Sequence, residues 1–214
     1  MRGIEIIRNG CSIHTGDDLD LVQTSKVIGV PEIQSYLVEV PGRNGLLNLT
    51  KGLTGEVAYK NRTLKMEYVS LDKRETQLEV LDTMNSYHGD FIRIIDDDTP
   101  DYYYEGECTV SSEWDGVVLT ITLKIDAYPF RRALVPTTAS VALTSSDITF
   151  VMRNDGRPVK PVVIVETSAV ITHNGNKYTL SPGRYTGLTL QTGNNTITCS
   201  GSGTLTISFE EARI

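Results

Sequence analysis

The chain has few of the residues that build covalent cross-links and metal sites. Its three cysteines, Cys11, Cys108 and Cys199, are far apart in the 214-residue sequence and odd in number. No CxxC pair and no Cys/His cluster occurs, so neither a disulfide framework nor a zinc site is expected. We therefore predict no metal and no cofactor, and folding in a reducing cytoplasm fits this composition.

Long apolar runs are also missing. Nowhere do 18 apolar residues follow one another, so the sequence offers no transmembrane helix and we expect no membrane partner. The first residues, Met1-Arg2-Gly3-Ile4-Glu5, are typical of a folded strand rather than of a leader peptide.

Sequence signatures of catalysis are absent. There is no GxSxG elbow, no phosphate-binding GxxxxGK[ST] and no strand-GxGxxG-helix, and Gly201-Ser202-Gly203 is typical of a turn. His14, His88 and His173 are isolated in sequence, and His88 is more typical of a hydrogen-bonded structural histidine than of a catalyst. We predict that the protein is not an enzyme, with a hydrolase as the third and last alternative.

Charge is distributed unevenly along the chain. Residues 1–135 contain 14 Lys and Arg against 22 Asp and Glu, a net charge of −8, whereas residues 136–214 contain 6 against 5, a net charge of +1. The two parts together give the formal charge of −7. An acidic half of this size repels nucleic acid, which argues against a DNA- or RNA-binding protein. An acidic surface also keeps a protein soluble, and that simpler interpretation stays open.

The densest acidic cluster is Asp96-Asp97-Asp98 with Asp101. Carboxylates this close can hold a hard cation such as calcium, but the spacing matches no EF-hand and Thr99-Pro100 indicates a loop. A solvated acidic loop is the favoured interpretation. The tyrosines that follow, Tyr102 to Tyr104, are expected on a strand, in packing or subunit contact.

Alternation of apolar and polar residues predicts a mainly β fold with one helix. Leu64, Met66 and Tyr68 alternate with polar residues, and the same two-residue period runs from Leu119 to Ile125. A strand is also expected from Glu32 to Val40. The helix is predicted to begin at an Asp72 cap with Glu75 as its capping-box partner, and to end at Gly89. Its apolar face would carry Val80, Leu81, Met84, Tyr87 and His88.

A break in composition at Ala127-Tyr128-Pro129-Phe130-Arg131-Arg132, followed by Pro136, predicts two domains, residues 1–133 and 134–214. Short strands are expected after it, with a two-residue type I′ hairpin turn at His173-Asn174-Gly175-Asn176. Their even spacing indicates an antiparallel sandwich or a jelly roll. The predicted strands are Ser140–Leu143, Ile148–Met152, Val162–Glu166, Ala169–His173, Lys177–Leu180, Gly187–Leu190, Asn195–Cys199 and Thr204–Phe209.

Glycines punctuate the span from Val40-Pro41-Gly42-Arg43-Asn44-Gly45 to Tyr59-Lys60-Asn61-Arg62. Glycine permits left-handed turns, and Asn44-Gly45 is a tight-turn signal. The span is either a long surface hairpin or an arm that reaches beyond its own domain.

This span resembles the N-terminal signature of the distal tail proteins of long-tailed, non-contractile bacteriophages. In that family Pro-Gly-Arg-x-Gly precedes an aromatic-x-Asn-Arg element, a strand and one helix, and the first domain often ends in an aromatic-Pro-aromatic step. The C-terminal part, with Gly193-Asn194-Asn195 and Gly201 to Phe209, is similar to the end of the family's galectin-like β-sandwich. The resemblance implies a tail-tube-like first domain with both helix and strand, followed by that sandwich.

The resemblance also implies a structural role in the virion tail. Family members form a hexameric ring, sometimes two rings back to back, that joins the tail tube to the tail tip or baseplate and lets DNA pass. The implied partners are further copies of the chain, the tail tube protein, the tail-associated hub protein and receptor-binding or baseplate proteins attached to the second domain. The expected inter-subunit arm residues are Gly42, Arg43, Asn44, Gly45, Gly52, Gly55, Asn61 and Arg62.

Two further expectations concern the ring and its rival. If the first domain forms a ring, some of its acids should face the DNA channel, with Asp96, Asp97, Asp98, Glu75, Glu79 and Asp82 as candidates. The second hypothesis is a carbohydrate-binding sandwich that contributes to adhesion to the host surface. The galectin pattern of clustered His, Asn, Arg and Trp is absent, because the single Trp114 lies in the first domain and the second offers mainly Tyr178 and Tyr185.

Overall fold

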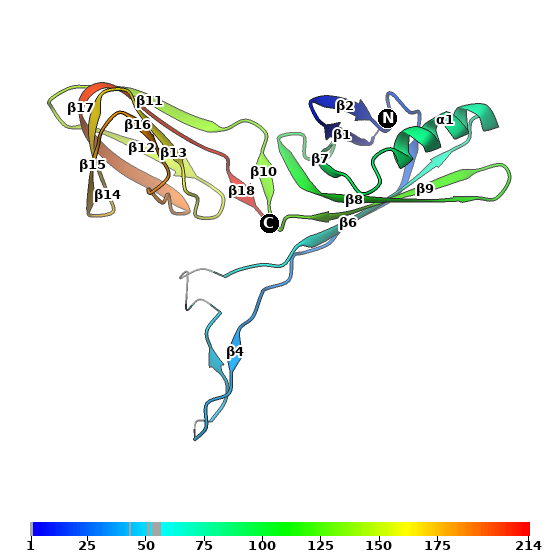
Figure 1. Ribbon diagram of the computed structural model, residues 1–214, viewed down its shortest axis with the longest axis horizontal. Helices are drawn as coiled ribbons and strands as arrows, with labels where there is room; N and C mark the ends of the chain where they lie inside the picture. Colours follow the sequence, from blue (N-terminus) through cyan, green and yellow to red (C-terminus); the bar gives the residue numbers. More distant parts are fainter. Residues whose placement is uncertain (1, 43, 51, 53–56) are drawn as a thin grey trace. The chain divides into compact units, whose positions relative to one another are not determined.

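The computed structural model describes residues 2–42, 44–50, 52 and 57–214. The protein is mainly β with one helix, as the sequence predicts (Figure 1). The chain divides into two compact units, residues 1–131 together with Ile214, and residues 132–213. We call them the first and second units. The roles predicted for residues 1–133 and 134–214 stay predictions.

The first unit is built on one antiparallel sheet. Its main path has the order β2-β1-β7-β8-β9-β6-β3, so the strands β2 and β3 stand at the two ends of this path. The strands are β1 (Ile4–Arg8), β2 (Cys11–His14), β3 (Val22–Ile28), β6 (Arg62–Ser70), β7 (Phe91–Asp96), β8 (Tyr102–Trp114) and β9 (Leu119–Ala127).

The two-residue periods seen in sequence place one face of β6 and β9 in the core. Leu64 lies opposite Ile125, and Met66 lies opposite Leu123. All four side chains are almost completely buried. Since each such side chain contributes about 1.5–3 kcal/mol when buried, this row is a large part of the first unit's stability. Both predicted strands are confirmed.

The helix α1 (Arg74–Asn85) covers this apolar face with Val80 and Met84, which join the same core (Figure 1). The predicted helix ends are wrong. Lys73 is the N-cap, with no side-chain capping bond, because the chain stays extended past Asp72 (Lys73 ψ 150°). The helix ends before Gly89, whose left-handed φ of 84° instead belongs to the turn that follows.

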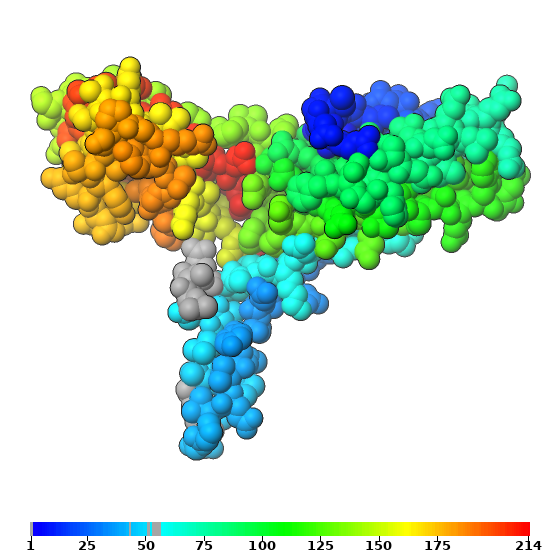
Figure 2. All heavy atoms as spheres, in the orientation of Figure 1, coloured from blue at the N-terminus to red at the C-terminus, as the bar shows by residue number. Residues whose placement is uncertain are grey.

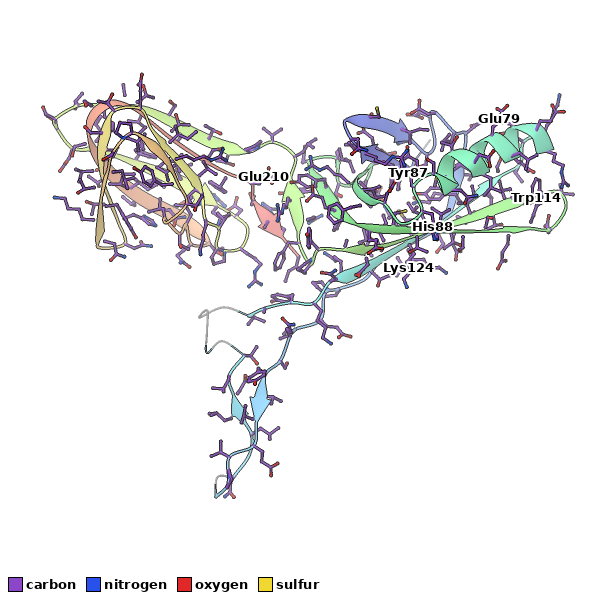
Figure 3. The ribbon with its side chains drawn as sticks, viewed as in Figure 1. Glu79, Tyr87, His88, Trp114, Lys124 and Glu210 are labelled. Carbon is purple, nitrogen blue, oxygen red and sulfur yellow. The ribbon has the colours of Figure 1, made fainter. Side chains whose placement is uncertain are left out.

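The start of the helix has no side-chain cap and is held instead by a buried glutamine. Gln77 donates from Nε2 to the carbonyl oxygens of Ser70 at 3.0 Å and Val117 at 2.9 Å. The first turn of α1 is therefore tied to the end of β6 and to the β8–β9 turn. Tyr87 and His88, predicted on the helix, lie just beyond it (Figure 3).

The second unit has two antiparallel sheets that share one long strand. One sheet contains β12, β14 and β15, the other contains β11, β13 and β16, and β17 belongs to both. Their inner side chains form a single core, as expected for a sandwich. The strands are β11 (Thr137–Leu143), β12 (Ile148–Asn154), β13 (Val162–Val165), β14 (Ser168–His173), β15 (Asn176–Leu180), β16 (Gly183–Tyr185) and β17 (Gly193–Phe209), and β10 (Arg131–Ala133) pairs with β18 (Ala212–Arg213).

Two strands predicted separately are one. Asn195–Cys199 and Thr204–Phe209 both belong to β17, and Gly201-Ser202-Gly203, predicted as a turn, is where this strand passes from one sheet into the other. The φ angles of Gly201 (145°) and Gly203 (80°) permit the change of direction. The predicted strand Gly187–Leu190 is reduced to a bridge between Leu190 and Val159, and β16 lies earlier in the chain.

The predicted β14–β15 hairpin is confirmed. Asn174 (φ 49°) and Gly175 (φ 77°) are both left-handed, as a type I′ turn requires, and His173 pairs with Asn176.

Candidate functional site: a hairpin arm and its anchor

The described residues between 30 and 61 form a narrow ribbon, and we call this segment of the chain the arm (Figure 1). It contains the short strands β4 (Leu37–Val38) and β5 (Leu47–Asn48), which pair antiparallel. Nearer the base of the arm, the backbone N–H of Gln34 donates to the carbonyl oxygen of Ala58 at 2.9 Å. The backbone N–H of Lys60 donates to the carbonyl oxygen of Glu32, also at 2.9 Å. The strand predicted from Glu32 to Val40 is wrong in length, because among the described residues of this span only Leu37 and Val38 form a regular strand.

The arm exposes large apolar side chains. Val30 is 78% exposed, Tyr36 65% and Leu46 55%, and Ile33, Leu37 and Leu49 are also exposed. In Figure 2 the blue-to-cyan atoms of the arm form a narrow column whose visible surface is not covered by other described parts of the chain. Open hollows of about 520 and 460 Å³ lie along it, the first lined by Tyr36, Leu49 and Ala58 among others. An isolated two-stranded hairpin is marginally stable in water, and an exposed apolar surface of this kind commonly marks an interaction site in proteins.

The glycines of the arm allow its turns. Gly42 (φ 81°) and Gly45 (φ 78°) adopt left-handed angles that most L-residues avoid. Gly52 donates its N–H to Leu49 at 2.8 Å. Asn44 and Asn61 are exposed. Arg43 and Gly55, also predicted as arm residues, lie outside the described residues.

Arg62, predicted to contact another subunit, is instead a buried anchor at the base of the arm. It is 5% exposed, donates from Nε to the carbonyl oxygen of Gly29 at 2.7 Å and from Nη1 to that of Pro129 at 3.3 Å. Its guanidinium also lies over the ring of Tyr104, 5.3 Å from the centroid. Burial lowers the pKa of Arg62, and its charge is held by carbonyl dipoles and an aromatic face.

The two motifs of the first unit meet at this anchor. Tyr59, which begins the aromatic-x-Asn-Arg element, packs edge to face on Phe130 with centroids 5.5 Å apart. Pro129 accepts from Arg62, and Tyr128 packs on Phe91 at 5.7 Å. Sequence reasoning found both motifs but missed that they form one structure. The aromatic residues present in both motifs were the only signal in the sequence that the two could meet.

The acidic cluster is partly paired within the chain. Lys26 Nζ lies 2.8 Å from Oδ2 of Asp96 and also pairs with Asp98, while Asp97 accepts from the N–H of Gly3 at 2.8 Å. Asp96 is only 2% exposed, so it does not fit the role of a channel-facing acid. The ammonium of Lys26 lies where a cation between these carboxylates would be. Within the described residues, no group of three His, Cys, Asp or Glu is placed to hold a metal ion.

The helix acids and the uncovered sheet face lie on different sides of the first unit. Glu75, Glu79 and Asp82 are exposed on α1, which covers one face of the sheet. Figure 3 shows Lys124 projecting from β9 on the side away from Tyr87. We call this side the open face. It carries alternate residues of β6, β8 and β9, namely Thr63, Lys65, Glu67, Glu107, Thr109, Ser111, Glu113, Thr122, Lys124 and Asp126.

Charges of like sign are neighbours on the open face. Lys65 lies directly opposite Lys124, and Glu107 lies opposite Asp126. Directly opposed like charges destabilise a sheet, so the stability of the isolated fold does not explain why charged residues of the same sign occupy these paired positions. Lys65 has a compensating pair with Glu67 at 2.7 Å.

The two tyrosines considered for sugar binding do not line a site of the usual size. Tyr178 and Tyr185 do lie together, but around a hollow of only about 110 Å³, whereas small-molecule sites commonly have about 300 Å³ or more. His173 is buried, with Nδ1 3.0 Å from the carbonyl oxygen of Thr196 and Nε2 3.1 Å from that of Thr189. It therefore holds backbone together rather than facing a ligand.

Comparison with known proteins identifies the fold. No protein-family model matches the chain, and no curated protein matches its sequence. The crystal structure of the SPP1 Dit (gp 19.1) protein, described as a paradigm of the hub adsorption apparatus in phages that infect Gram-positive bacteria, matches with a TM-score of 0.67 at 14% identity. The match covers 99% of each chain. This chain has the Dit fold.

The fold expected from the resemblance to distal tail proteins is thereby confirmed over the length of the chain. At 14% identity the likeness to Dit concerns the fold. Among the described residues, no helix has the length and apolar character needed to cross a membrane.

Proposed function

We propose that this protein is a structural component of a phage tail, placed at its distal end, that joins the tail tube to the tip or baseplate. The observation that carries the proposal is the Dit fold over 99% of both chains, together with an arm whose apolar side chains have no cover. Fold alone does not license function, but the arm is a surface that needs a partner. The proposed location is the virion tail, and the role is structural rather than enzymatic.

The arm supports assembly into a ring. A contact between the arm of one copy and a different surface of the next is head-to-tail, and repeated head-to-tail contacts close into a ring when the rotation fits. We propose six copies, alone or as two rings back to back. The free edges of β2 and β3 at the ends of the main sheet path are further surfaces through which neighbouring copies can pair.

The open face supports a channel for DNA. It carries the acids Glu67, Glu107, Glu113 and Asp126 against the lysines Lys65 and Lys124, so its net charge is negative. A channel wall of this kind repels DNA in transit and keeps it from adhering. The helix acids Glu75, Glu79 and Asp82 would then face outward. Asp97 and Asp98 stay candidates only if the wall extends past the end of β7.

The second unit is proposed as a peripheral attachment domain. It has its own core and a nearly neutral charge, so the first unit can assemble without it. The proposed partners are the tail tube protein and the tail-associated hub protein at the ring, and receptor-binding or baseplate proteins at the second unit.

The arm is tested by removing its apolar side chains. Leu37→Ser, Leu46→Ser and Leu49→Ser together should leave a folded protein that no longer forms rings, because the exposed apolar surface that a neighbour would cover is lost. Light scattering gives the mass, and electron microscopy shows closed annuli if they exist. The matched control is Leu71→Ser with Leu78→Ser, two exposed leucines outside the arm.

Two results contradict the proposal. One is a wild-type protein that stays monomeric at high concentration and in the presence of its tube protein. The other is an arm variant that assembles as well as the control.

A further inference from the structure

A basic hollow of about 590 Å³ lies on the outer face of one sheet of the second unit. Its floor includes Val162 and Ile164 of β13, and Arg132, Lys160 and Arg184 contribute cationic side chains. Ile164 is 47% exposed while its neighbours Val163 and Val165 are buried, so it points away from the sandwich core. All of the lining residues belong to the second unit.

The three cations are not used by the fold. In the part of the chain that the structure describes, Arg132, Lys160 and Arg184 have neither an ion pair nor a side-chain hydrogen bond. Several other cations behave differently, since Arg8 and Lys26 in the first unit and Arg153 in the second pair with carboxylates of their own chain. The hollow has a single carboxylate, Glu210 (Figure 3), so positive charge is in excess there.

The floor adds a second requirement on the ligand. Arg184 lies directly opposite Ile164 in the β13–β16 pair, so a cation and an exposed apolar side chain are adjacent on this face. β16 is also the last strand of its sheet, and its outer edge has no strand partner among the described residues. An extended peptide can therefore lie across this face beside the free edge, with successive side chains directed to opposite walls of the hollow.

We propose that this hollow binds an extended acidic segment of a protein partner, in which carboxylates alternate with branched aliphatic side chains. The carboxylates pair with Arg132, Lys160 and Arg184, and an aliphatic side chain covers Ile164. Charge complementarity selects the acid, and the apolar floor favours a peptide over a polyanion such as polyphosphate. This inference deepens the attachment role proposed for the second unit, but it does not depend on ring formation and holds for a monomer.

The test follows the Ile164 δ1-methyl signal by NMR in the full chain, with the signal assigned by Ile164→Val. The probe is a blocked peptide of four Glu-Val repeats, and the matched probe is the same peptide with Lys in place of Glu. Titration with the Glu peptide should move the Ile164 signal in a saturable way, and the Lys peptide should leave it unchanged. Raised salt should weaken the binding, because exposed charges are screened.

Variants then assign the binding to the three cations. Arg132→Gln, Lys160→Gln and Arg184→Gln together should weaken binding by about 3- to 125-fold, since each exposed ion pair is worth a factor of about 1.4 to 5. The control Lys177→Gln removes an exposed lysine on β15, in the other sheet, and should bind like the wild type. Unchanged core methyl signals show that each variant is folded.

The inference is overturned if the Glu peptide leaves Ile164 unmoved, or if the triple variant binds as the wild type does. It is also overturned if polyphosphate moves the signal as strongly as the peptide, since the site would then select charge alone. None of these results bears on the ring, whose failure would appear in the mass of the assembly instead.

Discussion

Tyr59 and Phe130 pack edge to face with their centroids 5.5 Å apart, although β6, α1, β7, β8 and β9 lie between them in the sequence. The contact joins the end of the arm to the end of the last strand of the first unit. A hydrogen bond from the Arg62 guanidinium to the carbonyl oxygen of Pro129 joins the same two segments. The base of the arm is thus fixed by side chains and backbone from segments far apart in the sequence, while most of the described residues further along the ribbon are exposed.

Replacing Arg62 should destabilise the first unit. Arg62→Leu leaves the carbonyl oxygens of Gly29 and Pro129 without this donor, and each lost partner in a buried site costs about 1–3 kcal/mol. We expect the free energy of unfolding in urea to fall by about 2–4 kcal/mol. The neighbouring Lys60→Leu, which removes only an exposed ion pair with Glu32, should cost less than about 1 kcal/mol. Equal effects of the two changes would contradict the anchor.

The crossing point of β17 should tolerate no side chain. In Gly201→Ala the new methyl group would collide with the backbone of Ser168, and the φ of 145° is unfavourable for alanine. We expect a loss of about 2 kcal/mol or more in the stability of the second unit, followed by circular dichroism. Gly187→Ala is the control, because an added methyl there meets no atom within 4 Å. A stable Gly201→Ala protein would contradict the placement of the crossing.

One thiol per chain should react in the native protein. Cys11 is exposed, whereas Cys108 and Cys199 are buried in the two cores. Burial raises the pKa of Cys108 to about 12 and also raises the pKa of Cys199, which further suppresses the reactive thiolate. Titration with a chromogenic disulfide should therefore give one fast equivalent without denaturant and three in urea. The variant Cys11→Ser should remove the fast equivalent, and rapid reaction of a second thiol would be evidence against the cores described.

Acid should weaken the first unit through Asp98. A hydrogen bond from Lys26, with its charge, lowers the pKa of Asp98 below its usual value of about 3.9. Its stabilisation is therefore complete above the unfolded-state pKa and is lost as the pH falls through the lower, folded-state pKa. The urea midpoint of the wild type should fall with acid in this range, and Asp98→Asn should show a shallower dependence. Asp101→Asn, which changes an exposed acid with no pair to Lys26, should keep the wild-type slope.

A truncated chain should separate assembly from attachment. Residues 1–135 contain the arm, its anchor and the whole first core, so we expect them to assemble as the full chain does while losing the attached partners. Light scattering of the truncated and full-length proteins checks this. A truncated protein that is a folded monomer where the full chain forms a ring would show that the second unit takes part in closure.

Local sequence patterns predicted the regular elements well. β6 and β9 follow their two-residue periods because every second side chain is fully buried in one core. The Asn174-Gly175 turn was also predictable, since left-handed angles restrict the choice of residues.

The misplaced elements have physical reasons. Asp72 looked like a cap, but Gln77 fixes the helix start through contacts with the distant Val117, which no local pattern encodes. Gly201 and Gly203 looked like a turn, because glycine serves equally to end a strand and to redirect it. The arm motif showed where the chain leaves its domain, but not that Arg62 is buried, since its acceptor Pro129 lies 67 residues away.

The arm leaves and rejoins the sheet at one place. Gly29 donates its N–H to Thr63 at 2.9 Å, and just before it Ile28 lies opposite Leu64 in the β3–β6 pair. Everything from residue 30 to residue 61 is thus an excursion between two strands that are already neighbours. Its length and composition can change in evolution without altering the register of the sheet. A different arm could therefore be inserted between β3 and β6. The sheet would stay the same, while the protein that the arm contacts would change.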